Sequence, residues 1–236
     1  MANVISKFKL RGTLGGITFY KSCDQELARE KGTPGVTKKQ FALNSAFDPI
    51  RKHSKEFGSC SKKSCVFRQL AKPLYDKAKD VSFAGRVNQL LFEILEEDVH
   101  HPRGERLLSN GLLTKDGVSF LLHFEGNKLR PLDKVLSVPI VFDWNTFSIT
   151  LSQLNVMCDI VWPEPEANQV HFQLGVANWN CDLDTYEHYF SDEIVLDRED
   201  KVVPLSFSLA PLSNQDLWLA FFYIGFSNKQ RKKVKF

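Results

Sequence analysis

The chain lacks the short motifs that mark most enzymes and metal sites. It contains no Gly-x-Ser-x-Gly nucleophile elbow, no His-Glu-x-x-His pattern and no Cys-x-x-Cys pair. The glycines of 12–16 lack the Gly-Lys-Ser/Thr that follows in a phosphate-binding loop, so we expect turns there. The five cysteines are odd in number and irregularly spaced, which favours free thiols. We therefore expect no catalytic site, no cofactor and no metal, and a protein that is not an enzyme.

Long hydrophobic runs are also missing. No stretch approaches the ~18 uncharged apolar residues of a membrane-spanning helix. The longest apolar run, 217–226, is typical of a buried strand, either central in its sheet or covered by helices. The first residues alternate apolar and basic types and lack the apolar segment of a secretory signal. We expect synthesis as a cytoplasmic chain, with release or export as part of an assembly left open.

What the chain does have is charge sorted by position. Residues 1–92 contain 18 lysines and arginines against 7 acids, whereas residues 107–228 contain 6 against 16. The last eight residues, 229–236, add five cations and no acid. Such segregation favours attraction between copies of the chain. Docking of the basic part on the acidic part of the same chain is an alternative, and nucleic-acid binding by the basic part is a less economical one.

The N-terminal part is predicted to be a hairpin followed by helices. Glycines at 12, 15 and 16 favour turns between two segments of strand-like residues, which predicts a hairpin as far as residue 20. Residues 24–30 fit neither a helix nor a strand period clearly. Apolar residues spaced by three and four predict helices within 41–97, the most regular of them over 83–97.

Three single features refine the helical prediction. Gly58 is expected to end the first helix, and Pro73 to kink or restart the second. The third helix carries acids at 93–98, the unfavourable end of the helix dipole. We expect a cationic neighbour there, for which Arg103, Arg106 and another subunit are the candidates.

Beyond a boundary at residues 100–104 the apolar period changes from 3.6 to 2. Asn110-Gly111 predicts a hairpin turn, and residues 118–124 alternate as a strand does. Short strands separated by turn signals predict an antiparallel sandwich of roughly seven to nine strands, Ig-like or jelly-roll-like. The fold class is thus α+β: a basic hairpin plus three-helix region over 1–99, an acidic β-sandwich over 105–228 and a basic tail over 229–236.

Two clusters of possible ligands fit structural roles better. Carboxylates at alternate positions in 181–188 could hold a cation, but no glycine or closing ligand follows, so a solvated acidic loop is the better interpretation. His100 and His101 diverge as neighbours and lack a third ligand, which favours a linker between domains.

Several short blocks of residues follow one another in order in the N-terminal region: Gly15-Gly-Ile-Thr-Phe-Tyr-Lys21, Leu27-Ala-Arg-Glu-Lys-Gly32, Phe47-Asp-Pro-Ile-Arg51, Glu56-Phe-Gly58 and Gly85-Arg86. On these blocks, about residues 8–106 resemble a family of small proteins from Bacteroidota that has no established activity. The chain departs from the pattern at Asp24-Gln-Glu26 and in having Cys60 and Cys65. The resemblance supplies no functional residues to carry over.

Together these patterns predict a structural subunit that assembles with copies of itself into a filament, tube or phage-like particle. Basic N-terminal and C-terminal segments would meet the acidic sandwich of a neighbour. The alternatives are a monomeric binding module that recognises a protein or ligand through its sandwich loops, and a nucleic-acid-packaging protein. The residues expected at contacts between copies are Lys7, Lys9, Arg11, Phe19, Tyr20, Asp182, Asp184, Glu187, Arg231, Lys232, Lys233, Lys235 and Phe236.

Overall fold

The computed structural model describes residues 10–22, 25–32, 35–163, 165–210 and 217–229, and the backbone of Ala2–Asn3. Its internal contacts divide the chain into two compact units, Met1–Pro49 and Ile50–Phe236. This division differs from the predicted boundary at 100–104, because the helices after residue 50 share a hydrophobic core with the following sheet. The two units are taken in turn.

The first unit is a small antiparallel sheet followed by a short helix. Gly15 adopts a φ of 59° in the β2–β3 turn, a region that residues with a side chain rarely adopt. The predicted hairpin is thereby confirmed, and the segment without a clear period becomes a further strand, β4, paired along its whole length with β3. The strand order in the sheet is β1 (Ala2–Asn3), β4 (Gln25–Glu30), β3 (Ile17–Ser22) and β2 (Gly12–Leu14). The sheet is followed by the helix α1 (Lys38–Leu43) and the 3-10 turn η1 (Ser45–Phe47).

The second unit begins with three helices, α2 (Asp48–Leu70), α3 (Lys72–Ala78) and α4 (Phe83–Glu96). The predicted end at Gly58 is wrong, since α2 continues for three more turns, held on both sides of that glycine by buried Glu56 and Cys60. Pro73 lies in the first turn of α3 and restarts the helix as predicted. The apolar stripe of α4 is buried as predicted, through Phe83, Val87, Leu90, Leu91, Ile94 and Leu95.

Two short helices replace the hairpin and strand predicted for 106–124, α5 (Leu108–Leu112) and α6 (Lys115–Leu122). A third short helix, α7 (Leu132–Val135), follows. Gly111 does not make a hairpin turn. A Cβ at this position would lie 1.9 Å from the carbonyl oxygen of Ile94, so the glycine permits close packing of α5 on α4. Thr114 starts α6 by accepting a hydrogen bond from the Gly117 amide, at 3.0 Å. The alternation of apolar residues in 118–124 predicted a strand, and this prediction is wrong because most of the segment belongs to α6.

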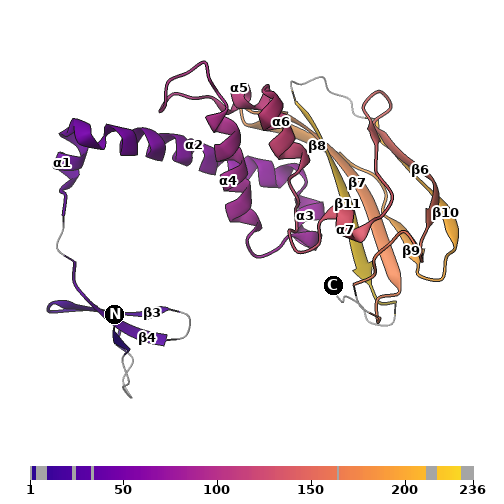
Figure 1. The fold of residues 1–236 in the computed structure, drawn as a ribbon, viewed down its shortest axis with the longest axis horizontal. Coiled ribbons are helices and arrows are strands. Elements are labelled where there is room, and N and C mark those ends of the chain that lie inside the picture. Colours follow the sequence, from indigo (N-terminus) through magenta and orange to yellow (C-terminus); the bar gives the residue numbers. More distant parts are fainter. Residues whose placement is uncertain are drawn as a thin grey trace. The chain divides into compact units, whose positions relative to one another are not determined.

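Seven antiparallel strands follow within the described residues, which confirms the α+β class with sandwich-like sheets (Figure 1). One sheet has the order β10-β6-β5; the other has the order β11-β7-β8, with β9 also paired to β7. Figure 1 shows the helices against the second sheet and β6 and β10 on its opposite side. The strands are β5 (Phe142–Asp143), β6 (Ser148–Asn155), β7 (Gln169–Asn180), β8 (Thr185–Phe190), β9 (Ile194–Asp197), β10 (Val202–Ser208) and β11 (Trp218–Ser227).

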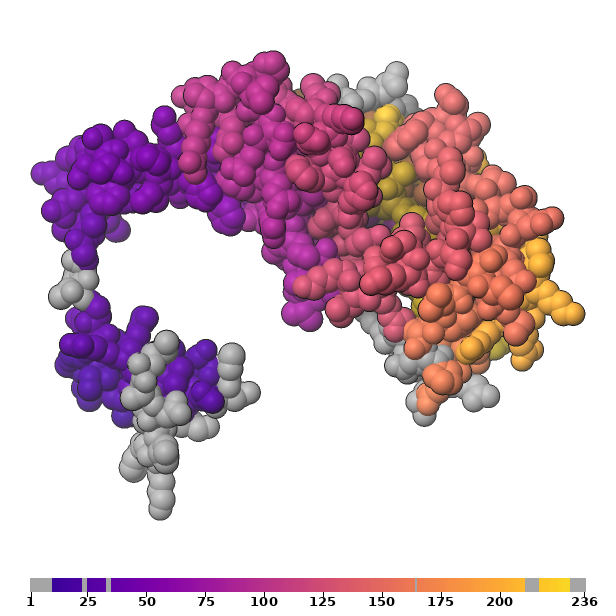
Figure 2. Space-filling view, viewed as in Figure 1, coloured from indigo at the N-terminus to yellow at the C-terminus, as the bar shows by residue number. Residues whose placement is uncertain are grey.

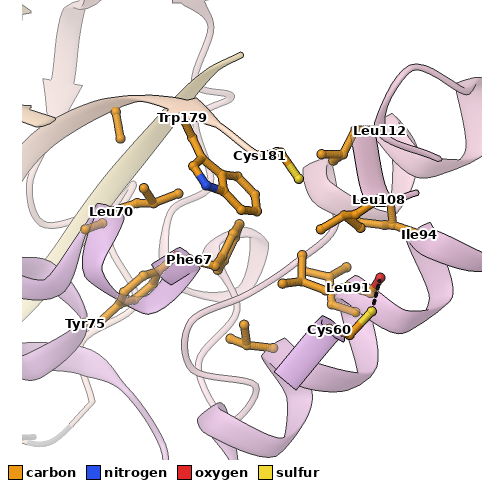
Figure 3. Packing of buried hydrophobic residues seen from close by; sticks show 14 of the residues in the cluster. Cys60, Phe67, Leu70, Tyr75, Leu91, Ile94, Leu108, Leu112, Trp179 and Cys181 are labelled. Atoms are coloured by element: carbon orange, nitrogen blue, oxygen red, sulfur yellow. Dashed lines mark hydrogen bonds between the residues drawn. The ribbon is translucent and has the colours of Figure 1, made fainter. Parts of the chain in front are cut away.

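Two hydrophobic cores bind these three layers together. Between the helices and the sheet, Phe67 of α2 packs edge-on against Trp179 of β7, with ring centres 5.9 Å apart (Figure 3). Between the two sheets, Phe172 of β7 and Phe207 of β10 lie in the second core. In Figure 2 the surface runs without a break from the helices, in magenta, to the strands, in orange. The helices and the sandwich thus form one folded unit.

The longest apolar run of the sequence forms β11, and both sides of this strand pack against other parts of the second unit. Phe221 and its alternate neighbours pack towards the helices, whereas Phe222 and Ile224 pack towards the other sheet. Helices cover the strand as one of the two predicted alternatives requires. It lies at the end of the order β11-β7-β8, however, rather than at the centre.

Candidate functional site

One face of the N-terminal sheet presents apolar side chains to solvent, with charged residues at its ends. Strand register places Leu14, Ile17 and Glu30 in one row, Gly12, Phe19 and Ala28 in the next, and Lys21 and Glu26 in a third. Side chains in alternate positions share a face, so these three rows lie on one side of the sheet, which we call the Phe19 face. Leu14 is 72% exposed and Ile17 is 47% exposed. The face therefore offers a surface on which another sheet can pack.

The other side of this sheet is more polar. Tyr20 lies under the guanidinium of Arg29, 5.4 Å from its carbon to the ring centre. The hydroxyl groups of Thr13 and Thr18 are hydrogen-bonded across the β2–β3 pair, at 3.1 Å. These contacts tie the strands to one another, but they bury little apolar surface.

No side chain of the first unit is buried among its described residues, 10–22, 25–32 and 35–49. The second unit, in contrast, contains two extensive cores. A small sheet needs a hydrophobic face packed against another layer for stability. The exposed Phe19 face is therefore the surface of this unit that gains most from a partner.

A basic stripe follows the solvent-facing side of α2. Lys52, Lys55 and Lys62 are exposed at helical spacing, and none of them forms an ion pair with any described residue. Charges on one helix face attract an acidic surface and lose that attraction as salt increases.

Other cations of the helical layer bind the acidic half of the same unit. Lys63 of α2 donates to the backbone carbonyl of Cys181 and to the carboxylate of Asp184, the latter at 3.2 Å. Lys77 of α3 forms an ion pair with Glu193 at 3.0 Å. Part of the segregated charge is thus satisfied within one chain, by the docking that the sequence offered as an alternative.

The predicted contact residues fall into three groups. Arg11 is exposed just before β2, and Phe19 and Tyr20 are half-buried in β3. Asp182 and Asp184 lie in the β7–β8 turn and Glu187 in β8, all exposed; Glu187 accepts a hydrogen bond from the Tyr189 hydroxyl. The remaining candidates lie outside the described residues: Lys7, Lys9, Arg231, Lys232, Lys233, Lys235 and Phe236.

The acids at the end of α4 obtain the predicted cationic partner through Arg106. Its guanidinium lies 3.4 Å from Glu96 and also forms a two-point ion pair with buried Glu56, with bonds of 2.9 and 2.7 Å. Arg103 contacts His53 instead. The amide of Gly104 donates to Glu56 at 2.6 Å. The side-chain hydrogen bond from Arg106 is the main reason that the pKa of Glu56 lies below its usual value. This cluster joins α2 to the segment after α4.

Asp98 anchors the same segment from within. Its carboxylate is buried and accepts hydrogen bonds from the amides of His100 and Leu107, and lies 2.8 Å from Nδ1 of His101. Burial alone would raise the pKa of Asp98, but these hydrogen bonds hold it well below its usual range. His101 therefore belongs to a structural network, in a segment that was predicted as a linker.

A polar row on β7 was not singled out from the sequence. Asn178 is fully buried, and neither atom of its amide group has a hydrogen-bond partner among the described residues. It lies between Trp218 of β11 and Glu187 of β8 in the strand register. The alternating pattern of β7 could have marked this residue, because it places an asparagine on the same face as four apolar residues, Val170, Phe172, Leu174 and Val176.

Within the described part of the chain, no three histidine, cysteine or acidic side chains lie close enough to hold a metal ion. The described cysteines, Cys60, Cys65, Cys158 and Cys181, are free thiols; burial raises the pKa of Cys60 to about 11 and that of Cys181 to about 12, which opposes their use as nucleophiles. Among the described helices, none is long and apolar enough to cross a membrane.

Comparison with family models, curated proteins and solved structures finds no match to the chain. The resemblance to the Bacteroidota family stays a prediction.

Proposed function

We propose that the chain is a structural subunit that assembles with copies of itself into a filament, tube or phage-like particle. The observation that carries this proposal is the N-terminal sheet, whose described side chains are all at least partly exposed although one face carries apolar residues, among them Leu14 and Ile17. Association with another copy buries that face and supplies the packing that a four-stranded sheet needs.

The charges of the second unit supply a further contact of a different kind. The stripe of Lys52, Lys55 and Lys62 is complementary in sign to the exposed Asp182 and Glu187 of a neighbouring copy. A contact between two different surfaces repeats from copy to copy, and it produces rings or open filaments. The ion pairs of Lys63 and Lys77 are made within the chain, so they are not available for this contact.

Sedimentation velocity and negative-stain microscopy across protein concentration and ionic strength test the proposal. We expect large species at low salt that dissociate as salt increases. Charge reversal of Lys52, Lys55 and Lys62 to glutamate should reduce assembly. The matched control reverses three exposed lysines from the acidic half, Lys115, Lys134 and Lys201, and should leave assembly intact. A monodisperse monomer under every condition would contradict the proposed function.

A monomeric binding module is the second candidate, and Asn178 is the observation that favours it. An unpaired buried amide costs about 1–3 kcal/mol, so a ligand that bonds to it would stabilise the fold. The row with Trp218 and Glu187 offers an aromatic face and a carboxylate for the same ligand. Native mass spectrometry of the purified protein would reveal a retained ligand, which Asn178→Leu should remove. A monomer without bound mass would argue against this candidate.

A further inference from the structure

We propose that the Phe19 face binds the same face of a second copy, around a two-fold axis that runs parallel to the strands between β3 and β4. This inference rests on the proposed function, because it names the partner of the N-terminal sheet and the geometry of their contact. Two antiparallel sheets commonly pack with their strands nearly aligned and about 10 Å apart.

Shape complementarity selects this axis. Phe19 of β3 and Ala28 of β4 are direct cross-strand neighbours. A two-fold axis between the two strands exchanges them, so each phenylalanine ring lies over the small Ala28 of the second copy. An axis through β3 itself would instead place the two Phe19 rings on each other. Large side chains packed over small ones fill the interface without voids or overlap.

Charge complementarity selects the same axis. Lys21 and Glu26 are also cross-strand neighbours, at one end of the Phe19 face. The axis between β3 and β4 brings Lys21 of each copy over Glu26 of the other. The axis through β3 would bring two Lys21 side chains together, and like charges that face each other are destabilising. The contact thus combines two ion pairs at one end with Phe19 over Ala28 at its centre, and it places Ile17 over Glu30 of the other copy at the far end.

The size of the sheet makes this a weak contact. The four strands have two, three, six and six residues. At a strand spacing of about 4.8 Å and a rise of about 3.3 Å per residue, they cover about 270 Å². A standard interface buries about 800 Å² per partner, so the sheet pair supplies roughly a third of that. Dimerisation through the Phe19 face should therefore depend strongly on concentration. It becomes persistent when a second contact joins the same copies.

Two charge-reversed variants of the full chain test the contact. Lys21→Glu gives the Phe19 face two facing acids, and Glu26→Lys gives it two facing cations. Each variant alone should associate at least tenfold more weakly than the unmodified protein in sedimentation velocity. An equimolar mixture should regain association, since the glutamate introduced in one variant then faces the lysine introduced in the other across the two-fold axis. The unfavourable pair within each sheet remains in the mixture, so recovery reports only on contacts between copies. Thr18→Glu, on the opposite face, is the control and should have little effect.

A measurement on the unmodified protein covers the case in which a variant does not fold. Chains labelled with ¹⁴N and ¹⁵N are mixed, treated with a carbodiimide that joins amines to carboxylates, and digested. We expect a Lys21–Glu26 cross-link that joins one light and one heavy peptide. Cross-links only between peptides of the same isotope would overturn the inference, as would assembly without recovery in the mixture of folded variants. These results differ from failure of the proposed function, in which the protein stays monomeric throughout.

Discussion

The clearest energetic test concerns the buried ion pair that joins α2 to the segment after α4. Glu56 is 2% exposed and accepts three hydrogen bonds, two from Arg106 and one from the amide of Gly104. Glu56→Ala leaves the guanidinium with only its 3.4 Å contacts to Glu96 and leaves the Gly104 amide without an acceptor. Removing one partner of a buried pair costs about 3–5 kcal/mol, because the remaining charge is uncompensated. We expect a loss of about 3–4 kcal/mol for Glu56→Ala.

Combining Glu56→Ala with Arg106→Ala measures the interaction energy between the two side chains, apart from their contacts with other residues. Arg106→Ala should cost about 3 kcal/mol by the same mechanism, although Glu56 keeps the bond from Gly104. The double variant should cost clearly less than the two single variants combined, with a coupling energy of about 2 kcal/mol, because it leaves no unpaired charge behind. Each single variant should lower the melting temperature by about 10 °C, given the typical unfolding entropy of a domain of this size.

Urea unfolding monitored by tryptophan fluorescence measures these losses. All four tryptophans lie in the second unit, and Trp179 is fully buried in the core between helices and sheet.

The stabilisation by Glu56 should depend on pH. Folding lowers the pKa of Glu56, so its contribution to the free energy of unfolding is complete above the unfolded pKa of 4.5 and is lost as the pH falls through the folded pKa. The difference in the free energy of unfolding between the unmodified protein and Glu56→Ala should therefore become smaller as the pH is lowered. Single losses below about 1 kcal/mol, or strict additivity in the double variant, would refute the reasoning.

Three further predictions concern single positions of the second unit. Gly58→Ala should stabilise the protein by about 0.5–1 kcal/mol in urea unfolding, because a Cβ at this mid-helix site meets nothing within 4 Å. Gly111→Ala should destabilise the protein by about 3 kcal/mol, since the new Cβ would overlap the carbonyl of Ile94. A change in the free energy of unfolding of less than about 1 kcal/mol would contradict the close packing of α5 on α4. Asp98→Asn should cost about 1.5–3 kcal/mol at pH 7, because hydrogen bonds to a charged acceptor are lost. The pKa of Asp98 is lowered in the folded state, so this cost should shrink as the pH falls below 3.8, and a cost that is constant with pH would argue against an ionised Asp98.

Prediction from the sequence succeeded where local chemistry and packing agree. The stripe of α4 has helical spacing and is buried at every predicted position. Pro73 interrupts a helix or begins a new one, because it has no backbone N–H, and it lies in the first turn of α3. The prediction failed at Gly58 and Gly111, which are turn signals by composition. Gly58 costs about 1 kcal/mol in a helix, less than the burial of its neighbours contributes, and Gly111 serves close helix packing.

Only part of the candidate site could be predicted from the sequence. Phe19 and Tyr20 were identified as contact residues, but the Phe19 face also includes Ala28, which lies in a segment without a clear period. Asp184 was predicted to contact another copy, whereas its carboxylate pairs with Lys63 of the same chain, 121 positions away. Such long-range contacts leave no mark in a local pattern.

The sequence by itself determined the segregation of charge, the α+β class and the absence of short catalytic motifs, because these follow from residue types and their spacing. Tertiary structure alone decided which cations are paired within the chain and which side chains of the first unit stay exposed. Ion pairs and burial depend on how distant segments meet in space. The sorted charge therefore marks both an internal contact, through Lys63 and Lys77, and a stripe through Lys52, Lys55 and Lys62 that forms no ion pair with the described residues.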